Sequence, residues 1–186
     1  MERGVINNSQ KEINRGKTVA SFIMGTKRLF DFIDNNPAVA MHPIDYVNNP
    51  LVIMKHKNFV SINSCIQIDL MGQVVAESIG NKQISGVGGQ VDFVRGAAMA
   101  ENGRSIIAMT STALDGKISK IVPYIDKGAA VTTSRNDVDY VITEYGIAAL
   151  KGYSLCERAK ALISIAHPDF REQMLYEWKQ KYKLAV

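Results

Sequence analysis

The sequence lacks the features that mark several common classes of protein. Among its 186 residues there are two cysteines, Cys65 and Cys156, and neither belongs to a Cys-x-x-Cys pair. The three histidines, His42, His56 and His167, lie far apart, so no Cys/His cluster has the spacing of a zinc site. We therefore expect both thiols to lie in the core and no metal ion to be bound.

Long apolar runs and concentrated charge are also missing. No apolar run approaches the roughly 18 residues that a membrane-spanning helix needs, and the first eight residues, MERGVINN, lack the apolar stretch of a signal peptide. The 22 basic and 18 acidic residues give a formal net charge of +4, and the basic residues are scattered without alternating aromatics. These absences favour a cytoplasmic protein that binds neither membrane nor nucleic acid, although a small anionic ligand fits the charge.

What is present is an alternation of strand-like and helix-like segments. Because Met71-Gly72 is typical of a hairpin turn, a strictly parallel sheet is excluded and a mixed α/β fold is expected. The first sixteen residues carry almost no helix or strand signal and read as a connection running into a domain. Strands are expected at 17–23, 39–41, 58–70, 73–78, 105–109, 117–123, 129–133 and 138–143, and helices at 26–35, 91–100, 154–166 and 168–183.

The most informative segment is the glycine-rich stretch 85–93, SGVGGQVDF, between a strand-like and a helix-like region. Bare main-chain amides beside a helix N-terminus favour an anion or a developing oxyanion. A dinucleotide fingerprint would need glycine at Val91, and a P-loop would need lysine at Gln90, so neither nucleotide motif is present. The segment is either a ligand-binding loop or a tight turn that binds nothing.

Three polar residues are candidates for chemistry. Asn63 lies inside a strand-like run, where its amide either holds a substrate carbonyl or marks a bulge or strand end. Glu144 ends a strand, where α/β sheets often place functional groups, but a solvated turn carboxylate is the alternative. Lys117 follows the turn signal Asp115-Gly116 and either reaches an anion or faces water.

Several segments together resemble the C-terminal part of the acetyl-CoA hydrolase/transferase family, in its 4-hydroxybutyrate or butyrate:acetate CoA-transferase branch. The resemblance covers nearly the whole chain, and its most specific part is 85–98. The segments that carry it are ASFIMGTK (20–27), MHPIDYVN (41–48), VSINS (60–64), SGVGGQVDFVRGAA (85–98), KISKIVP (117–123), VITEYG (141–146) and AHPDFR (166–171).

The resemblance implies a fold and a domain position. It implies a three-layer α/β domain of the CoA-transferase (NagB/RpiA-like) type with a mixed sheet, which is the C-terminal half of a two-domain enzyme. Residues 1–16 would connect from an N-terminal domain that is missing, and 17–186 would form the CoA-transferase C-terminal domain. Such enzymes transfer CoA between carboxylates through a glutamate nucleophile and an enzyme–CoA thioester.

The resemblance also implies roles for particular residues. Asn63 and Glu144 match polar positions that face the reacting acyl group, in supporting roles. The nucleophilic glutamate lies upstream of the region that aligns with Met1, so no glutamate here is given that role. The positions that would contact CoA are Gly86, Val87, Gly88, Gly89, Gln90 and Lys117.

We therefore expect a CoA-transferase domain that uses acyl-CoA, such as acetyl-CoA, and a short-chain carboxylate, and that is inactive without its upstream half. The alternatives are an acyl-CoA hydrolase with the same site and a noncatalytic binding or assembly module. The expected partners are the missing domain of the same enzyme and further copies of the chain in a homo-oligomer. Apolar surface left uncovered by the missing half should cause self-association.

Overall fold

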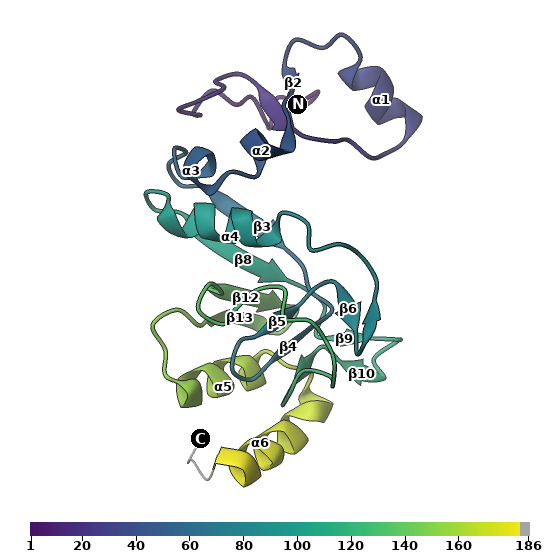
Figure 1. Ribbon diagram of the computed structural model, residues 1–186, viewed down its shortest axis with the longest axis vertical. Coiled ribbons are helices and arrows are strands. Elements are labelled where there is room, and N and C mark those ends of the chain that lie inside the picture. The colour runs from purple at the N-terminus through teal and green to yellow at the C-terminus, as the bar shows by residue number, and fades with distance from the viewer. Residues whose placement is uncertain (183–186) are drawn as a thin grey trace.

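The computed structural model of the protein describes residues 1–182. Its central element is a four-stranded sheet (Figure 1). Its strand order is β13-β12-β8-β3. Strands β3 (Val60–Asn63), β8 (Arg104–Ala108) and β12 (Tyr140–Thr143) are parallel, and β13 (Gly146–Ala149) returns antiparallel to β12 through a tight hairpin. The sheet is therefore mixed.

One face of this sheet is covered. Helix α4 (Gln90–Met99) packs on β3 and β8, and α5 (Leu155–Ser164) packs on β13. A smaller sheet lies on the same side, with β11 (Ile121–Val122) parallel and β5 (Val74–Val75) antiparallel to β4 (Gln67–Asp69). Together these elements enclose the hydrophobic core.

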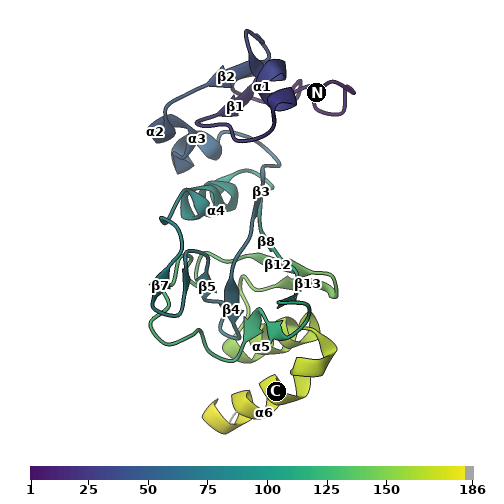
Figure 2. The ribbon, with the colours of Figure 1, turned by 90° about the vertical axis from the view of Figure 1, so that its right-hand side faces the viewer.

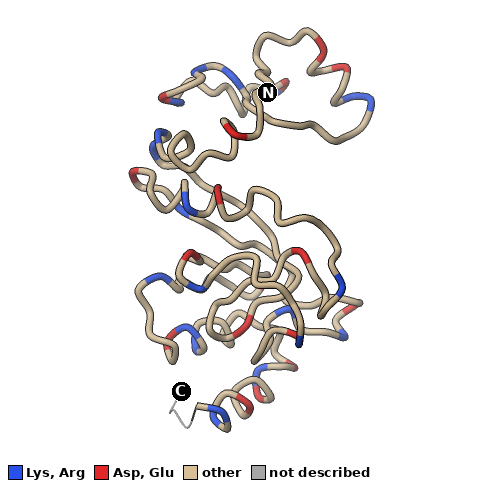
Figure 3. The backbone as a smooth tube through the Cα atoms, viewed as in Figure 1, with Lys and Arg blue, Asp and Glu red and all other residues tan. Residues whose placement is uncertain are grey.

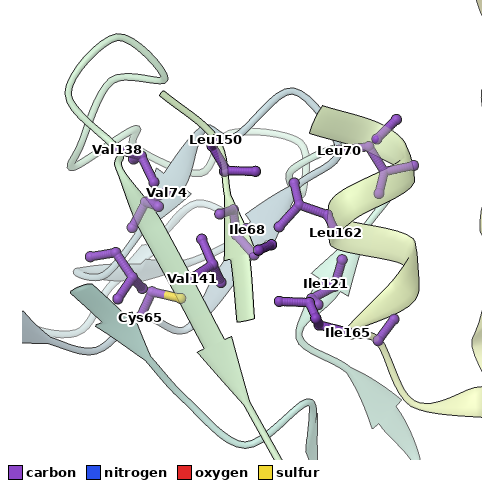
Figure 4. Packing of buried hydrophobic residues seen from close by; sticks show 14 of the residues in the cluster. Cys65, Ile68, Leu70, Val74, Ile121, Val138, Val141, Leu150, Leu162 and Ile165 are labelled. Atoms are coloured by element: carbon purple, nitrogen blue, oxygen red, sulfur yellow. The ribbon is translucent and has the colours of Figure 1, made fainter. Parts of the chain in front are cut away.

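The core joins side chains from all of these layers. Val141 of β12 faces Ile68 and Val74 of the small sheet and Leu162 of α5 (Figure 4). All four are fully buried, as is Trp178 of the last helix. Burial of such apolar side chains is the main favourable term in folding, so this cluster holds the domain together.

The remaining elements lie around this core. Preceding it in the chain, a parallel pair of strands and three helices form the top of the molecule in Figure 1. These elements are β1 (Thr18–Ala20), α1 (Lys27–Ile33), β2 (Val39–Met41), α2 (Ile44–Val47) and α3 (Pro50–Ile53). Two hairpins come later in the chain, β6 (Ser78–Ile79) with β7 (Lys82–Gln83) and β9 (Thr112–Ala113) with β10 (Ile118–Ser119). The last helix is α6 (Pro168–Tyr182).

Most of the expected elements are confirmed. The strand 39–41 has the expected bounds, the Met71-Gly72 hairpin joins β4 to β5, and α4 follows the glycine-rich segment. Ser154 and Glu157 form the expected capping box, in which each side chain accepts from the other's main-chain N–H. Lys183, near which the last helix was expected to end, lies outside the described residues.

Other expectations were wrong in detail. The run 129–133 is not a strand, because only a single bridge joins Thr133 to Val74. The runs 58–70 and 117–123 each divide between two sheets, since β3 and β4 pair with different partners, as do β10 and β11. Strand β13 and the β6–β7 hairpin were not anticipated.

Gly96 decides how closely α3 approaches α4. A Cβ placed on Gly96 would lie 2.6 Å from the Cβ of Ile53, which is nearer than real Cβ contacts allow. In a free helix, glycine to alanine is stabilising by roughly 0.5–1 kcal/mol. Here the added methyl group must displace a neighbouring element.

We expect Gly96→Ala to lower the free energy of unfolding by about 1–3 kcal/mol, as overpacking does. Urea denaturation measures this change. In an Ile53→Gly background the Cβ and Cγ2 atoms that the added methyl group would meet are gone, so the same substitution should be neutral or stabilising. Equal losses in the two backgrounds would contradict the steric explanation.

Candidate functional site

The candidate site lies where the parallel strands of the central sheet end. Asn63 is the last residue of β3, Ser111 lies three residues beyond β8, and Glu144 directly follows β12. Because β3, β8 and β12 are parallel neighbours, with Asn63 beside Ile107 in register, their carboxyl ends share one edge of the sheet. This edge is where open α/β sheets bind ligands.

The glycine-rich loop is directed to the same edge by the chain connection. Helix α4 ends in a turn at Asn102-Gly103 that leads into the beginning of β8, so the helix runs back along the strands. Its N-terminus therefore lies toward the carboxyl ends, where the loop 84–89 enters it from the β6–β7 side (Figure 1). Topology thus brings the loop, Asn63 and Glu144 to one end of the sheet.

The loop is held at both ends and free between them. The N–H groups of Ile84 and Ser85 donate to the carbonyl oxygen of Glu77, and Gln90 Nε2 donates to Thr133 Oγ1 at 3.0 Å. Within residues 1–182, the main-chain N–H groups of positions 86–89 donate no hydrogen bond. They remain available to a ligand, beside the positive end of the α4 dipole.

The geometry of the loop favours glycine at two positions. Gly88 has φ +65°, which other residues rarely adopt, and a Cβ on Gly89 would overlap the side-chain amide of Asn48. Val87, which directly precedes Gly88, is exposed. The loop therefore presents main chain and one apolar side chain to its surroundings.

Glu144 is fixed by Ser111 across the ends of β12 and β8. The Ser111 hydroxyl donates to Oε1 at 2.6 Å, and the Ser111 N–H donates to Oε2 at 2.8 Å. Desolvation by itself would raise the pKa of Glu144, but these hydrogen bonds outweigh it and, aided by His167, leave the pKa below its ordinary value. Glu144 is thus an oriented, ionised carboxylate.

Asn63 and Lys117 differ in how firmly they are held. The Asn63 side-chain amide donates to Ser61 Oγ at 2.7 Å and is half-exposed. Lys117 is exposed and follows a turn in which Leu114 and Asp115 have φ of 50° and 53°. Left-handed backbone at two successive non-glycine residues is strained and is concentrated at functional sites. The β9–β10 hairpin carrying Lys117 begins directly after Ser111, at the same edge.

Sequence reasoning missed Ser111. Nothing in its neighbours Thr110 and Thr112 distinguishes it as a partner for a carboxylate 33 residues away. A signal exists only once β8 and β12 are known to be adjacent and parallel, because residues just beyond their ends then meet.

Cys65 is a core residue, as expected. It is buried against Met109, with its Sγ 3.1 Å from the Sδ, and burial raises the pKa of its thiol to about 12. A thiol in this state is protonated at neutral pH and is not a nucleophile. Cys156 is half-buried on α5.

Residues 1–182 contain no group of three or more His, Cys, Asp or Glu placed to hold a metal ion. In the same part of the chain no helix has both the length and the apolar character to cross a bilayer. A surface cavity of about 920 Å³ lies between the N-terminal segment and α3, β3 and α4, and its lining includes His56 and Phe93 but none of the candidate site residues.

Comparison with known proteins shows the family to which the chain belongs. Residues 25–178 match the sequence model of the acetyl-CoA hydrolase/transferase C-terminal domain. The chain is 63% identical to 4-hydroxybutyrate coenzyme A transferase of Clostridium kluyveri over 98% of its length, and 52% identical to succinyl-CoA:cyclohexane-1-carboxylate CoA transferase of Geobacter metallireducens over 94%. The crystal structure of RipA from Yersinia pestis superposes with a TM-score of 0.93 and 44% identity over 98% of the chain.

The chain therefore belongs to the acetyl-CoA hydrolase/transferase family, within the region of its C-terminal domain. It spans 42% of the Clostridium relative, 40% of the Geobacter relative and 41% of RipA. Each of these proteins thus has a longer polypeptide than the part matched here.

We expect Ser111→Ala to raise the pKa of Glu144 toward its ordinary value, because the hydroxyl donor to the ionised form is lost. A carbon-13 NMR titration of the Glu144 carboxyl measures this pKa. Ser119→Ala, which removes a hydroxyl bonded to the Ile121 carbonyl instead, should leave it unchanged.

The same change should alter acid sensitivity. The pKa of Glu144 is lower in the folded state than in the unfolded state. The ionised carboxylate therefore stabilises the fold at pH values above the unfolded-state pKa, and this contribution is lost as the pH falls through the folded-state pKa. Stability of Ser111→Ala should therefore fall less steeply below the unfolded pKa of Glu144. An unchanged titration in the variant would show that Ser111 does not hold the carboxylate.

Proposed function

We propose that this chain supplies the CoA-binding part of a CoA-transferase that moves CoA between an acyl-CoA and a short-chain carboxylate. The observation that carries the proposal is the set of unengaged amides at 86–89, beside a helix N-terminus at the carboxyl edge of the sheet. The substrate pair includes acetyl-CoA and a carboxylate such as 4-hydroxybutyrate or butyrate. Family membership and the names of the two similar transferases support this assignment.

We further propose the domain organisation that this function requires. Residues 17–186 form the C-terminal domain of a two-domain enzyme of the NagB/RpiA-like three-layer type, and 1–16 connect it to an N-terminal domain. The whole enzyme acts in the cytoplasm as a homo-oligomer, with CoA as substrate and without a metal. The nucleophilic glutamate belongs to the upstream polypeptide, so this chain alone does not turn over.

The chemistry assigned to this chain is binding and charge stabilisation. When the upstream carboxylate attacks the thioester carbonyl, negative charge develops on the carbonyl oxygen and the CoA thiolate then leaves. Amides of Gly86, Val87, Gly88 and Gly89 donate to that oxygen or to the adjacent ligand, in the manner of an oxyanion hole. Gln90 holds the loop in place through Thr133.

The polar residues of the edge orient the substrate. The Asn63 amide donates to a carbonyl or carboxylate oxygen of the acyl group. Glu144, kept ionised by Ser111, accepts from an N–H or O–H group of the bound thioester. Lys117 pairs with a phosphate of CoA from the β9–β10 hairpin.

The second candidate is hydrolysis at the same site, with water in place of the acceptor carboxylate. The description of the matching family, which includes acetyl-CoA hydrolases, favours keeping it. The two reactions differ in whether acyl-CoA consumption requires an added carboxylate. A noncatalytic module remains the third alternative, and it predicts no affinity for CoA.

CoA at 100 times its dissociation constant should stabilise the isolated chain by about 2.7 kcal/mol, seen as a higher midpoint in thermal unfolding. Val87→Asp should reduce this shift, since a carboxylate at an exposed position of the loop repels the CoA phosphates. Val5→Asp, at an exposed position of the N-terminal segment, should not. Absence of any shift with the unaltered chain would favour the noncatalytic module.

Activity can be tested in a fusion of this chain to the part of the Clostridium relative that precedes the matched region. Asn63→Ala should lower kcat/KM for CoA transfer by roughly 10²–10³, the range for loss of one donor in an active site. Glu144→Gln, which replaces the accepting carboxylate with a neutral amide, should lower it as well. Glu101→Gln, which alters a surface partner of Lys57, is the matched control.

Two outcomes of this assay would change the assignment. Turnover by the chain alone at the rate of the fusion would contradict the assignment of the nucleophile to the upstream part. Acyl-CoA consumption at the same rate without an acceptor carboxylate would favour the hydrolase.

A further inference from the structure

The second face of the central sheet carries an almost unbroken apolar surface. Side chains alternate between the faces of a strand, and the register places neighbours in rows. Ile62 of β3 lies beside Ile106, which lies beside Tyr140 and then Ala149, while Ala108 lies beside Ile142 and then Ile147. With Val60 of β3, these eight residues define what we call the open face: Val60, Ile62, Ile106, Ala108, Tyr140, Ile142, Ile147 and Ala149.

The two faces of the sheet differ sharply in burial. On the core face, Ser61, Ile107, Val141 and Ala148 are 3%, 1%, 0% and 2% exposed. On the open face, Ile62 is 70% exposed. Ile147 and Val60 there are 66% and 45% exposed, and the other five residues are half-buried. A large apolar patch of this kind marks an interaction surface.

No helix of residues 1–182 covers the open face. Helix α4 and the small sheet lie on one side of β3 and β8, and the other side is bare (Figure 2). Charge is sparse there, since Arg104, which lies beside Val60 at one end of the open face, is the one charged residue in the four strands, and Figure 3 shows Lys, Arg, Asp and Glu mainly on helices and loops. All-parallel sheets are covered on both faces in almost every case, and three of the four strands of this mixed sheet are parallel.

A layer that covers the open face has to come from another polypeptide segment, and the longer relatives contain such a segment. RipA superposes on this chain with a TM-score of 0.93 over 98% of the chain, yet that is only 41% of RipA. A relative with the same strands thus has the same open face to cover and a long segment outside the matched region with which to cover it. A second copy of this chain would not supply such a layer from α4 and α5, because these helices already pack on the central sheet of their own copy.

We propose that the open face is the docking surface for the polypeptide that precedes the matched region in the longer relatives. That segment contributes a layer of helices with an apolar face, which completes the sheet as a three-layer structure. Because the open face and the carboxyl edge belong to the same strands, docking here positions the incoming segment next to Asn63 and Glu144. The inference depends on the fold and on family membership, and not on the proposed CoA chemistry.

Thiol labelling tests this surface directly. Ile62→Cys and Ile147→Cys are made in a Cys156→Ser background, in which Cys65 is buried and unreactive. Tyr176→Cys is the matched control, because Tyr176 is 59% exposed on α6, outside the central sheet. Each variant is prepared both as the isolated chain and as the fusion to the preceding part of the Clostridium relative.

Labelling with a maleimide is measured at a concentration where the isolated chain sediments as a monomer. In the isolated chain, all three thiols should react at similar rates. In the fusion, the thiols of Ile62→Cys and Ile147→Cys should react at least tenfold more slowly, while that of Tyr176→Cys is unchanged. Unaltered circular dichroism of each variant verifies that the substitutions leave the fold intact.

Several results would overturn the proposal. Equal labelling of the three thiols in the fusion would show that the upstream segment docks elsewhere. Protection of the Ile62→Cys thiol in the monomeric isolated chain would show that the face is already covered. A stable dimer at all accessible concentrations, protected at the open face, would identify a second copy as the occupant instead.

Discussion

The parallel alignment of β3, β8 and β12 is the constraint on which the rest of the molecule depends. It gathers the carboxyl ends of three strands at one edge, and the return path of α4 brings the glycine-rich loop to that edge as well. Antiparallel neighbours would have placed Ser111, which follows β8, at the opposite end of the sheet from Asn63 and Glu144. Glu144 is the first of the two residues in the turn from β12 to β13, so this hairpin turns at the same edge and adds β13 at the end of the sheet.

The edge combines rigid and unengaged groups in a way that suits an anionic, carbonyl-containing ligand. Glu144 has both oxygens bonded to Ser111, whereas the amides of 86–89 have their orientation fixed by anchors on either side and their hydrogens unengaged. Donors held in place before a ligand arrives need little reorganisation when charge develops, which is why such groups are effective in catalysis. The amides of 86–89 are held in place by the hydrogen bonds of Ile84, Ser85 and Gln90, which lie on either side of them.

Local signals in the sequence were sufficient for the elements that depend on neighbouring residues. The capping box at Ser154 and the hairpin at Met71-Gly72 fix their own geometry within a few residues, so both were predicted. Strand 129–133 was wrongly predicted because an apolar run does not say whether a pairing partner is available, and Val74 provides only one bridge. β13 was missed because its Gly146-Ile147-Ala148-Ala149 sequence has little strand propensity and owes its conformation to β12.

The candidate site divides in the same way. Local sequence pattern places the loop, Asn63 and Glu144 at the ends of strands and helices. The roles of these residues come from the family resemblance and are still predictions. Ser111 and the open face could not be found in this manner, since both depend on which strands are neighbours. A contact across 33 residues and a surface built from four strands exist only in the assembled sheet.

Trp178 gives the protein a built-in optical reporter. It is the single tryptophan of the sequence, it is fully buried on α6, and its ring lies 4.2 Å from that of Tyr182. Emission from an indole in such surroundings is blue-shifted and moves to longer wavelength when water reaches it. Fluorescence of the intact chain therefore follows the attachment of the C-terminal helix to the core, whereas the glycine-rich loop, which has no tryptophan, can change its state without altering that signal.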